Sequence, residues 1–125
     1  MGTDKIIHAE LSETIIGAAM KVLNTLKPGL DEKACENALV IELKNRGRRI
    51  EQQKRYDVLY EGQLVDTLVP DLIVDEVVIA DPKVVEEFSP AHLAQMLGYL
   101  TITNLRLALL LNFKHADLRW KRVVR

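Results

Sequence analysis

The chain has 125 residues, of which 48% are apolar, and a formal net charge of −1 at pH 7. This length fits one domain with one core, and no apolar run reaches the roughly 18 to 20 residues of a membrane-spanning helix. The lone Cys35 excludes an internal disulfide and a Cys-rich zinc site. The start, "MGTDKIIHAEL", lacks the apolar segment of a secretory signal, so we expect one soluble, cytoplasmic domain over residues 1–125.

Two helices are predicted first. In residues 12–26, Ser12 is a candidate N-cap, and apolar residues recur at helical spacing until "KPG" ends the pattern. In residues 31–47, Asp31 is a candidate N-cap and the final glycine a C-terminal stop. Glu32 and Glu36 lie one turn apart on this second helix, so their carboxylates can stand on the same side of it.

Extended segments are predicted next, where the apolar period changes to two. Residues 49–66 alternate and turn at "YEGQ". The runs "LVPDLIVD" (68–75) and "EVVIADPK" (76–83) are rich in β-branched residues and are typical of an antiparallel pair. We therefore expect three adjacent strands in the middle of the chain.

The last third predicts a helix and a covered strand. Ser89 as N-cap and Pro90 at the first helical position begin a helix in "SPAHLAQMLGYLTITN". The continuous apolar run "LRLALLLNF" is typical of a central strand buried on both faces, and the basic tail "KHADLRWKRVVR" follows it. The order is thus helix, helix, three strands, helix, strand and tail.

Charge is strongly segregated along the sequence. Residues 44–55 hold six Lys/Arg and one Glu, a net charge of +5, and residues 105–125 hold six Lys/Arg and one Asp, also +5. Residues 56–104 hold nine Asp/Glu and one Lys, a net charge of −8. The basic segments could bind a polyanion around an acidic, metal-binding centre, or they could be ordinary solvated faces.

Asp71, Asp81 and Lys83 are charged residues within otherwise apolar strands. Asp81 and Lys83 are two positions apart, so they project from the same face of their strand. A two-residue turn near Asp75 would pair Asp71 with Ala80 and put the aspartates on different faces. One extra turn residue would pair Asp71 with Asp81, and a shared site requires this second register.

In that register the two carboxylates would raise each other's pKa unless a cation shared them. Mg²⁺ takes oxygen ligands and is commonly bound by one or two carboxylates together with water and a substrate phosphate. The adjacent lysine could orient a water or neutralise charge developing on phosphorus. The pattern therefore points to phosphodiester hydrolysis.

Short motifs along the whole chain support a family resemblance. They are Gly29, Glu32 and Cys35 in "GLDEKAC"; Asp71 in "PDL"; Asp81, Pro82 and Lys83 in "DPK"; Gln95 and Tyr99 in "HLAQMLGYL"; and the closing "LLLNF" and "KRVV". In this order they resemble the GxxExxY proteins of the PD-(D/E)XK nuclease-like superfamily, from about residue 10 to the end. The resemblance implies a restriction-endonuclease-like α/β core: a mixed sheet flanked by helices, with a three-strand antiparallel meander and a crossover helix leading to a further strand.

The resemblance also implies roles for individual residues. Asp71 and Asp81 would bind Mg²⁺ or Mn²⁺ with the backbone carbonyl of Pro82, and Lys83 would stand at the attacking water. Glu32 or Glu36 could add a ligand or an outer contact. As a fourth catalytic side chain, Gln95 would face the same site.

Two functions follow as expectations. The first is a Mg²⁺-dependent nuclease acting on DNA or RNA; the second is a catalytically silent nuclease-like fold that binds nucleic acid or protein, favoured by Cys35 in place of a family tyrosine and by Pro82 within a strand. A homodimer or a protein partner is possible in either case, and no membrane contact is expected. The residues expected to hold the nucleic-acid backbone are Arg48, Arg49, Lys54, Arg55, Lys121 and Arg122.

Overall fold

The computed structural model describes residues 7–125. The first six residues, which belong to the segment expected to lack a secretory signal, lie outside the described residues. The helices are α1 (Ala9–Leu26), α2 (Glu32–Asn45) and α3 (Pro90–Thr103). The strands are β1 (Ile50–Gln52), β2 (Tyr56–Tyr60), β3 (Gln63–Leu68), β4 (Leu72–Val74), β5 (Val78–Lys83), β6 (Leu107–Asn112) and β7 (Arg119–Val124).

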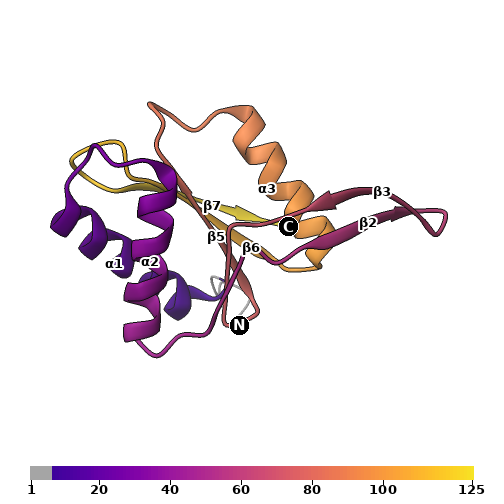
Figure 1. Ribbon diagram of the computed structural model, residues 1–125, viewed down its shortest axis with the longest axis horizontal. Coiled ribbons are helices and arrows are strands. Elements are labelled where there is room, and N and C mark those ends of the chain that lie inside the picture. Colours follow the sequence, from indigo (N-terminus) through magenta and orange to yellow (C-terminus); the bar gives the residue numbers. More distant parts are fainter. Residues whose placement is uncertain (1–6) are drawn as a thin grey trace, which may run out of the picture.

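Five strands form a mixed sheet in the order β1-β4-β5-β6-β7. Neighbouring strands are antiparallel except β5 and β6, which are parallel and are connected through α3. Figure 1 shows α1 and α2 together on one side and α3 apart from them. A parallel pair needs such a crossover, because the chain must return to the end at which the first strand began.

Two apolar clusters cover the two faces of the sheet. Alternate residues of β5 and β6 pack with α1 and α2 in the larger cluster, and the residues between them pack with α3 in the smaller one. All six residues of β6 are buried, as its uninterrupted apolar sequence predicts. Ile79 belongs to the α3 cluster, so Asp81 and Lys83, which follow it at intervals of two, project toward the same face.

The predicted helix starts are mostly confirmed. The Asp31 carboxylate accepts a hydrogen bond from the Ala34 amide, and the Ser89 hydroxyl accepts one from the His92 amide with Pro90 at the first helical position. Ser12 is wrong as a cap, because α1 begins three residues earlier and the Ser12 hydroxyl donates to the His8 carbonyl at 2.8 Å. Periodicity locates a helix better than its first residue.

The strand assignment differs from expectation in two places. The segment expected to continue the sheet instead forms a separate β2–β3 hairpin, so the three-strand meander consists of β1, β4 and β5. The basic tail contains β7, which pairs with β6 along its whole length. Among residues 7–125, no helix is both long and apolar enough to cross a bilayer.

Candidate active site

Strand register brings Asp71 and Asp81 together. Leu72 pairs with Ala80 and Val74 with Val78, so Asp71 and Asp81 are the next residues in line. Residues 75–77 form a three-residue turn, in which Asp75 and Glu76 have φ angles of 51° and 65°. The turn therefore has the extra residue that a shared site requires, and the two-residue alternative is wrong.

The alternating direction of the backbone hydrogen bonds places the side chains of Asp71 and Asp81 close together. The Gln53 amide donates to the Asp71 carbonyl at 3.0 Å, so the backbone polar groups of Asp71 point toward β1 and away from β5. Asp71 and Asp81 consequently face each other without exchanging backbone hydrogen bonds, the arrangement in which opposite side chains lie closest.

Asp81 is almost completely enclosed, with 2% of its surface exposed. Burial, together with the charge of Asp71, raises the pKa of Asp81 to about 7, although the Lys83 ammonium acts in the opposite direction. Lys83 Nζ lies 3.4 Å from Asp81 Oδ1, yet that oxygen is buried and forms no hydrogen bond within residues 7–125. The ion pair leaves Asp81 under-satisfied, which is costly for a buried carboxylate.

A third acid, Glu36, approaches from α2. Its buried carboxylate accepts hydrogen bonds from the side-chain amides of Gln52 at 2.8 Å and Gln53 at 3.0 Å. Gln53 also donates to Asp71 Oδ1 at 3.3 Å, so one amide links two carboxylates. Burial raises the pKa of Asp71, and the nearby charge of Glu36 adds to the effect. The sequence analysis did not identify either glutamine.

Glu32, one turn earlier on α2, lies beside the chain just after β5. Its carboxylate accepts a hydrogen bond from the Val84 amide at 3.2 Å, directly after Lys83. Glu32 therefore fixes the end of β5 to α2, whereas Glu36 is linked to Asp71 through Gln53.

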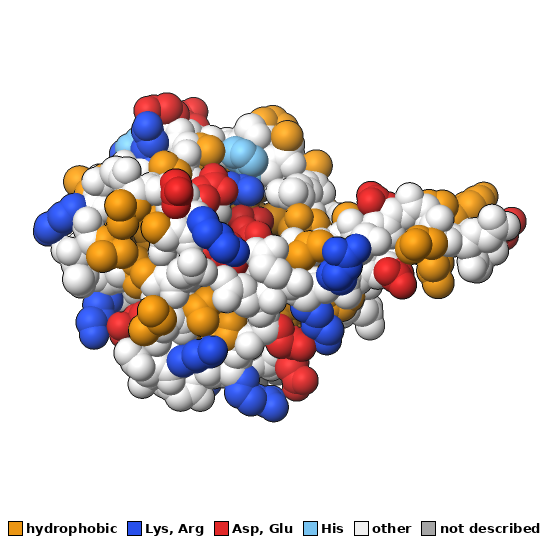
Figure 2. Space-filling model, viewed as in Figure 1, with side chains coloured by type: hydrophobic (Ala, Val, Ile, Leu, Met, Phe, Trp, Pro, Cys, Tyr) orange, Lys and Arg blue, Asp and Glu red, His pale blue; other side chains and the backbone are white. Residues whose placement is uncertain are grey.

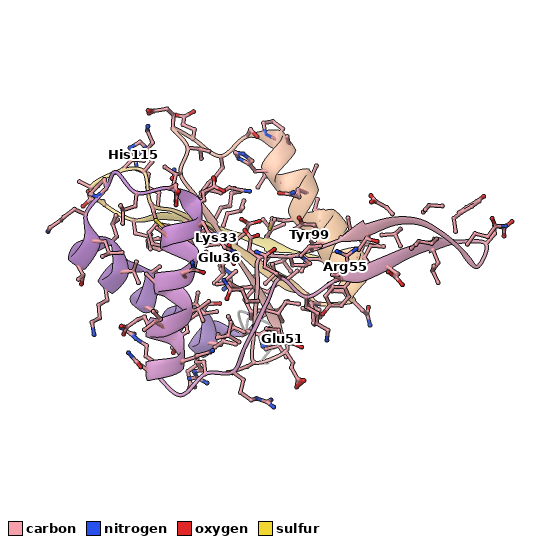
Figure 3. The ribbon with its side chains drawn as sticks, in the orientation of Figure 1. Lys33, Glu36, Glu51, Arg55, Tyr99 and His115 are labelled. Atoms are coloured by element: carbon pink, nitrogen blue, oxygen red, sulfur yellow. The ribbon has the colours of Figure 1, made fainter. Side chains whose placement is uncertain are left out.

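Helix α3 contributes Gln95 and Tyr99 from the other side. Gln95 Nε2 donates to the Tyr99 hydroxyl at 3.1 Å. Burial raises the pKa of Tyr99, and the charges of Asp81 and Asp71 raise it further. Figure 3 shows Glu36 from α2 and Tyr99 from α3 extending toward the same region. The sequence singles out Tyr99 only as a member of the motif that contains Gln95, and it assigns no role to the Tyr99 hydroxyl.

Pro82 is compatible with a central strand because backbone polar groups point to alternate sides along the strand. The Lys83 carbonyl accepts from Phe113 at 2.8 Å, so Lys83 turns its backbone polar groups toward β6. Alternate residues turn to opposite sides, so the Pro82 carbonyl points toward the β4 side, where pairing ends at Leu72 and Ala80. The missing N–H of Pro82 therefore breaks no ladder, and its carbonyl faces the side on which Asp71 lies.

The donor set suits a hard cation. Asp71 and Asp81 offer carboxylate oxygens, including the buried Asp81 Oδ1, which has no hydrogen-bond partner among residues 7–125, and Pro82 offers a carbonyl. Within residues 7–125, no group of three or more His, Cys, Asp or Glu side chains forms a ready-made metal cage. Mg²⁺ needs no such cage, because it retains several waters and takes one or two carboxylates.

The basic residues after α2 differ in their surroundings. Arg48 pairs with Asp75 at 3.1 Å and Arg49 with Glu76 at 3.3 Å, at the turn between β4 and β5. Lys54 pairs with Glu51 at 3.1 Å, and Arg55 is exposed at the start of the hairpin. Figure 2 shows carboxylates in the middle of this face with Lys and Arg side chains around them.

On β7, Lys121 and Arg122 project from opposite faces of the sheet. Arg122 donates to the Ser12 hydroxyl at 2.7 Å and to the Ile7 carbonyl at 2.8 Å, so it joins β7 to α1. Lys121 is exposed on the α3 face, the face of Asp81.

The fold and the paired carboxylates together define a nuclease-like α/β protein. A family profile described as the PD-(D/E)XK nuclease superfamily matches residues 9–123, and the chain belongs to that superfamily. No curated protein matches the sequence. Among solved structures, the chain is similar to an alkaline exonuclease from Laribacter hongkongensis, with a TM-score of 0.51, 11% identity, and coverage of 90% of this chain and 82% of that one.

These comparisons confirm the expected fold class. The mixed sheet, its antiparallel meander and the α3 crossover form a restriction-endonuclease-like core flanked by helices. Nucleases of this superfamily generally use divalent metals, and a nuclease-like fold suggests contact with nucleic acid.

Proposed function

We propose that this protein is a Mg²⁺- or Mn²⁺-dependent nuclease of the GxxExxY group that hydrolyses phosphodiester bonds of DNA or RNA in the cytoplasm. The observation that carries the proposal is the convergence of Asp71 and Asp81 on one face with Lys83 at 3.4 Å from Asp81. Two carboxylates at this spacing are costly without a shared cation. The lone, buried Cys35 agrees with a reducing compartment.

A divalent cation held by Asp71, Asp81 and the Pro82 carbonyl would polarise a phosphate oxygen and acidify a bound water. The chain's own residues prepare the site for it. Gln53 keeps Asp71 and Glu36 in fixed positions by donating to both carboxylates. Tyr99, held by Gln95, supplies a hydroxyl that can donate to a phosphate oxygen beside the acids.

Lys83 is proposed to act on the substrate. Its ammonium projects on the same face as Asp81 and is mostly buried, so its charge is poorly screened. It can donate to a non-bridging phosphate oxygen, or to the attacking water, and stabilise negative charge as the bond to phosphorus forms. Lys54 and Arg55, at the start of the hairpin, would hold the neighbouring backbone phosphates without reading sequence.

The alternative function is a silent nuclease-like fold that binds nucleic acid or a protein. The observation favouring it is the Lys83–Asp81 ion pair, because a closed internal pair would leave no charge for substrate. Against it, Asp81 Oδ1 has no hydrogen bond among the described residues, so the pair does not satisfy the carboxylate. We therefore place catalysis first.

The proposal is tested by incubating single- and double-stranded DNA and RNA with the protein and Mg²⁺ or Mn²⁺. We expect metal-dependent cleavage that Lys83→Ala lowers by roughly 10²- to 10³-fold, the usual effect of removing one stabilising donor. Asp71→Asn is expected to lower it at least as much, because it removes a ligand charge.

Matched controls separate chemistry from surface charge. Lys44→Ala and Asp117→Asn change an exposed lysine on α2 and an exposed aspartate before β7, and both variants should cleave like the wild type. If the folded, metal-supplied protein cleaves nothing, or if Lys83→Ala and Asp71→Asn cleave normally, the silent binding fold replaces the nuclease.

A further inference from the structure

The β2–β3 hairpin, residues 56–68, is an arm that extends away from the sheet (Figure 1). Tyr56 packs against the α3 cluster at its base, and the turn at its tip is Glu61-Gly62, both with positive φ. Between base and tip the arm exposes four large apolar side chains, each 60–71% accessible: Leu59, Tyr60, Leu64 and Val65.

Such an arm is expected to need further contacts for its stability. An isolated two-stranded hairpin is at best marginally stable in water, and a contiguous exposed apolar patch usually marks an interaction site. Strand β2 contacts α3, whereas β3 is exposed from Gln63 to Asp66. Tyr56 and Val58 of β2 are half-buried, so β3 offers the longer continuous exposed edge to a partner.

The charge of the arm decides which kind of partner is favoured. Residues 56–68 contain Asp57, Glu61 and Asp66 and no Lys or Arg, a net charge of −3. Figure 2 shows orange and red side chains along the arm, with blue gathered at its base. Binding of nucleic acid depends on cationic side chains, so the acidic arm would repel phosphates. Two such arms would also repel each other, because both are negatively charged.

The complementary surface is β7 of the same chain. It lies at the edge of the sheet, and its sequence "RWKRVV" carries a charge of +3, of which Arg119 and Lys121 are exposed. Trp120 and Val124 are exposed apolar residues beside them. The opposite edge, β1, has three residues and includes Glu51, so it offers neither the length nor the charge.

We propose that the arm of one copy docks on β7 of a second copy, with β3 adding to the sheet edge as an antiparallel strand. The β2–β3 pairing is irregular between Val58 and Leu59, and antiparallel pairing of residues 66–68 with residues 119–121 places Asp66 opposite Lys121. Main-chain hydrogen bonds along an exposed edge provide affinity, and side-chain pairs fix the register. Because β7 is then covered, Lys54 and Arg55 remain the residues for nucleic acid, and the interface does not depend on catalysis.

The experiment is light scattering of the purified full chain over a range of concentrations. The wild type is expected to exceed the 14.2 kDa of one chain as concentration rises. The double variant Leu64→Ser/Val65→Ser should remain a monomer, and because both side chains are exposed its circular dichroism should match the wild type. Leu26→Ser, at an exposed apolar residue of α1, is the matched control and should associate normally.

Charge reversal tests the particular pairing. Asp66→Lys and Lys121→Glu should each weaken association at low salt, and the two changes together should restore it. A chain that is monomeric at every concentration, an association that ignores these variants, or single-strand DNA binding that is lost with Leu64→Ser/Val65→Ser would overturn the interface.

Discussion

Asp81 is a carboxyl group in an unusually unfavourable position. It is buried and faces Asp71, and among residues 7–125 the one nearby positive charge is that of Lys83. The three effects do not balance, because burial and the like charge both favour the protonated form. Because the pKa of Asp81 is raised to about 7, protonation of this carboxyl links stability to pH.

We predict that the apo protein loses stability as pH rises. Since the pKa of Asp81 is raised from 3.8 to about 7, the folded state binds more protons than the unfolded state between these values. The stabilisation is complete below about pH 4 and is lost as pH rises through 7, amounting to on the order of a few kcal/mol. Urea unfolding in a chelator between pH 5 and 8 measures it.

Asp81→Asn provides the control for this effect, because an amide keeps the shape and cannot titrate. As pH rises, the free energy of unfolding of the wild type should fall relative to that of Asp81→Asn. An equal pH dependence in both proteins would assign the proton to another group.

Part of the site could be predicted from residue types alone. Asp81 and Lys83 share a face because strand residues alternate, and that conclusion needs no partner strand. The pairing with Asp71 needed the turn length, which remained open. Gln53 could not be found, because its role depends on hydrogen bonds to Glu36 and Asp71, 17 and 18 residues away.

At the scale of elements, the β4–β5 turn determines whether the site exists. Shortening it by one residue would move Asp71 to the opposite face, since side chains alternate with a period of two. The chain maintains the three-residue form with two non-glycine residues at positive φ, Asp75 and Glu76. Asp75 is held by Arg49, whose amide donates to its carboxylate at 2.8 Å, and Glu76 has only an exposed ion pair.

This difference predicts that Glu76→Gly stabilises the turn. A positive φ costs a side-chain-bearing residue about 1–2 kcal/mol, which glycine avoids, although glycine gains some entropy when unfolded. We expect Glu76→Gly to be more stable than Glu76→Ala by about 1 kcal/mol in denaturant unfolding. Both variants lose the pair with Arg49, so a Glu76→Ala protein as stable as Glu76→Gly would mean that the backbone is unstrained.

The helices and the buried strand β6 could be predicted because their patterns are local: caps, helical spacing and a continuous apolar run. The hairpin could be predicted as two extended segments joined at "YEGQ", but not as an arm outside the sheet. Alternation shows that a segment is extended and leaves its neighbour undetermined: β4 pairs with the distant β1 and not with β3, which directly precedes it in the chain.

For the molecule as a whole, segregated charge in the sequence becomes segregated surface. The acidic middle of the chain supplies both the enclosed carboxylates and the arm, while Lys54 and Arg55 lie between them at the base of the arm. Fewer cations are available to nucleic acid than the sequence suggests, because partners within the protein bind Arg48, Arg49, Lys54 and Arg122.

We therefore predict that nucleic-acid binding depends only weakly on salt concentration and that Arg55 makes a main contribution to it. Arg55→Ala should weaken binding of single-stranded DNA similarly for all sequences and reduce the slope of log K against log salt by about 1. Fluorescence anisotropy in a chelator, which prevents cleavage, measures both. An unchanged slope, or a loss equal to that of the exposed control Lys44→Ala, would place the phosphate contact elsewhere.

The position of the arm in the chain has an evolutionary consequence. It is inserted between Gln53 and Asp71, which remain joined by a 3.0 Å backbone hydrogen bond and a 3.3 Å side-chain hydrogen bond at its base. The arm can therefore lengthen, shorten or change its sequence without shifting the register that pairs Asp71 with Asp81, because lengthening such a loop costs little closure entropy. Chains that keep this carboxylate pair are therefore free to diverge in the length and sequence of the arm.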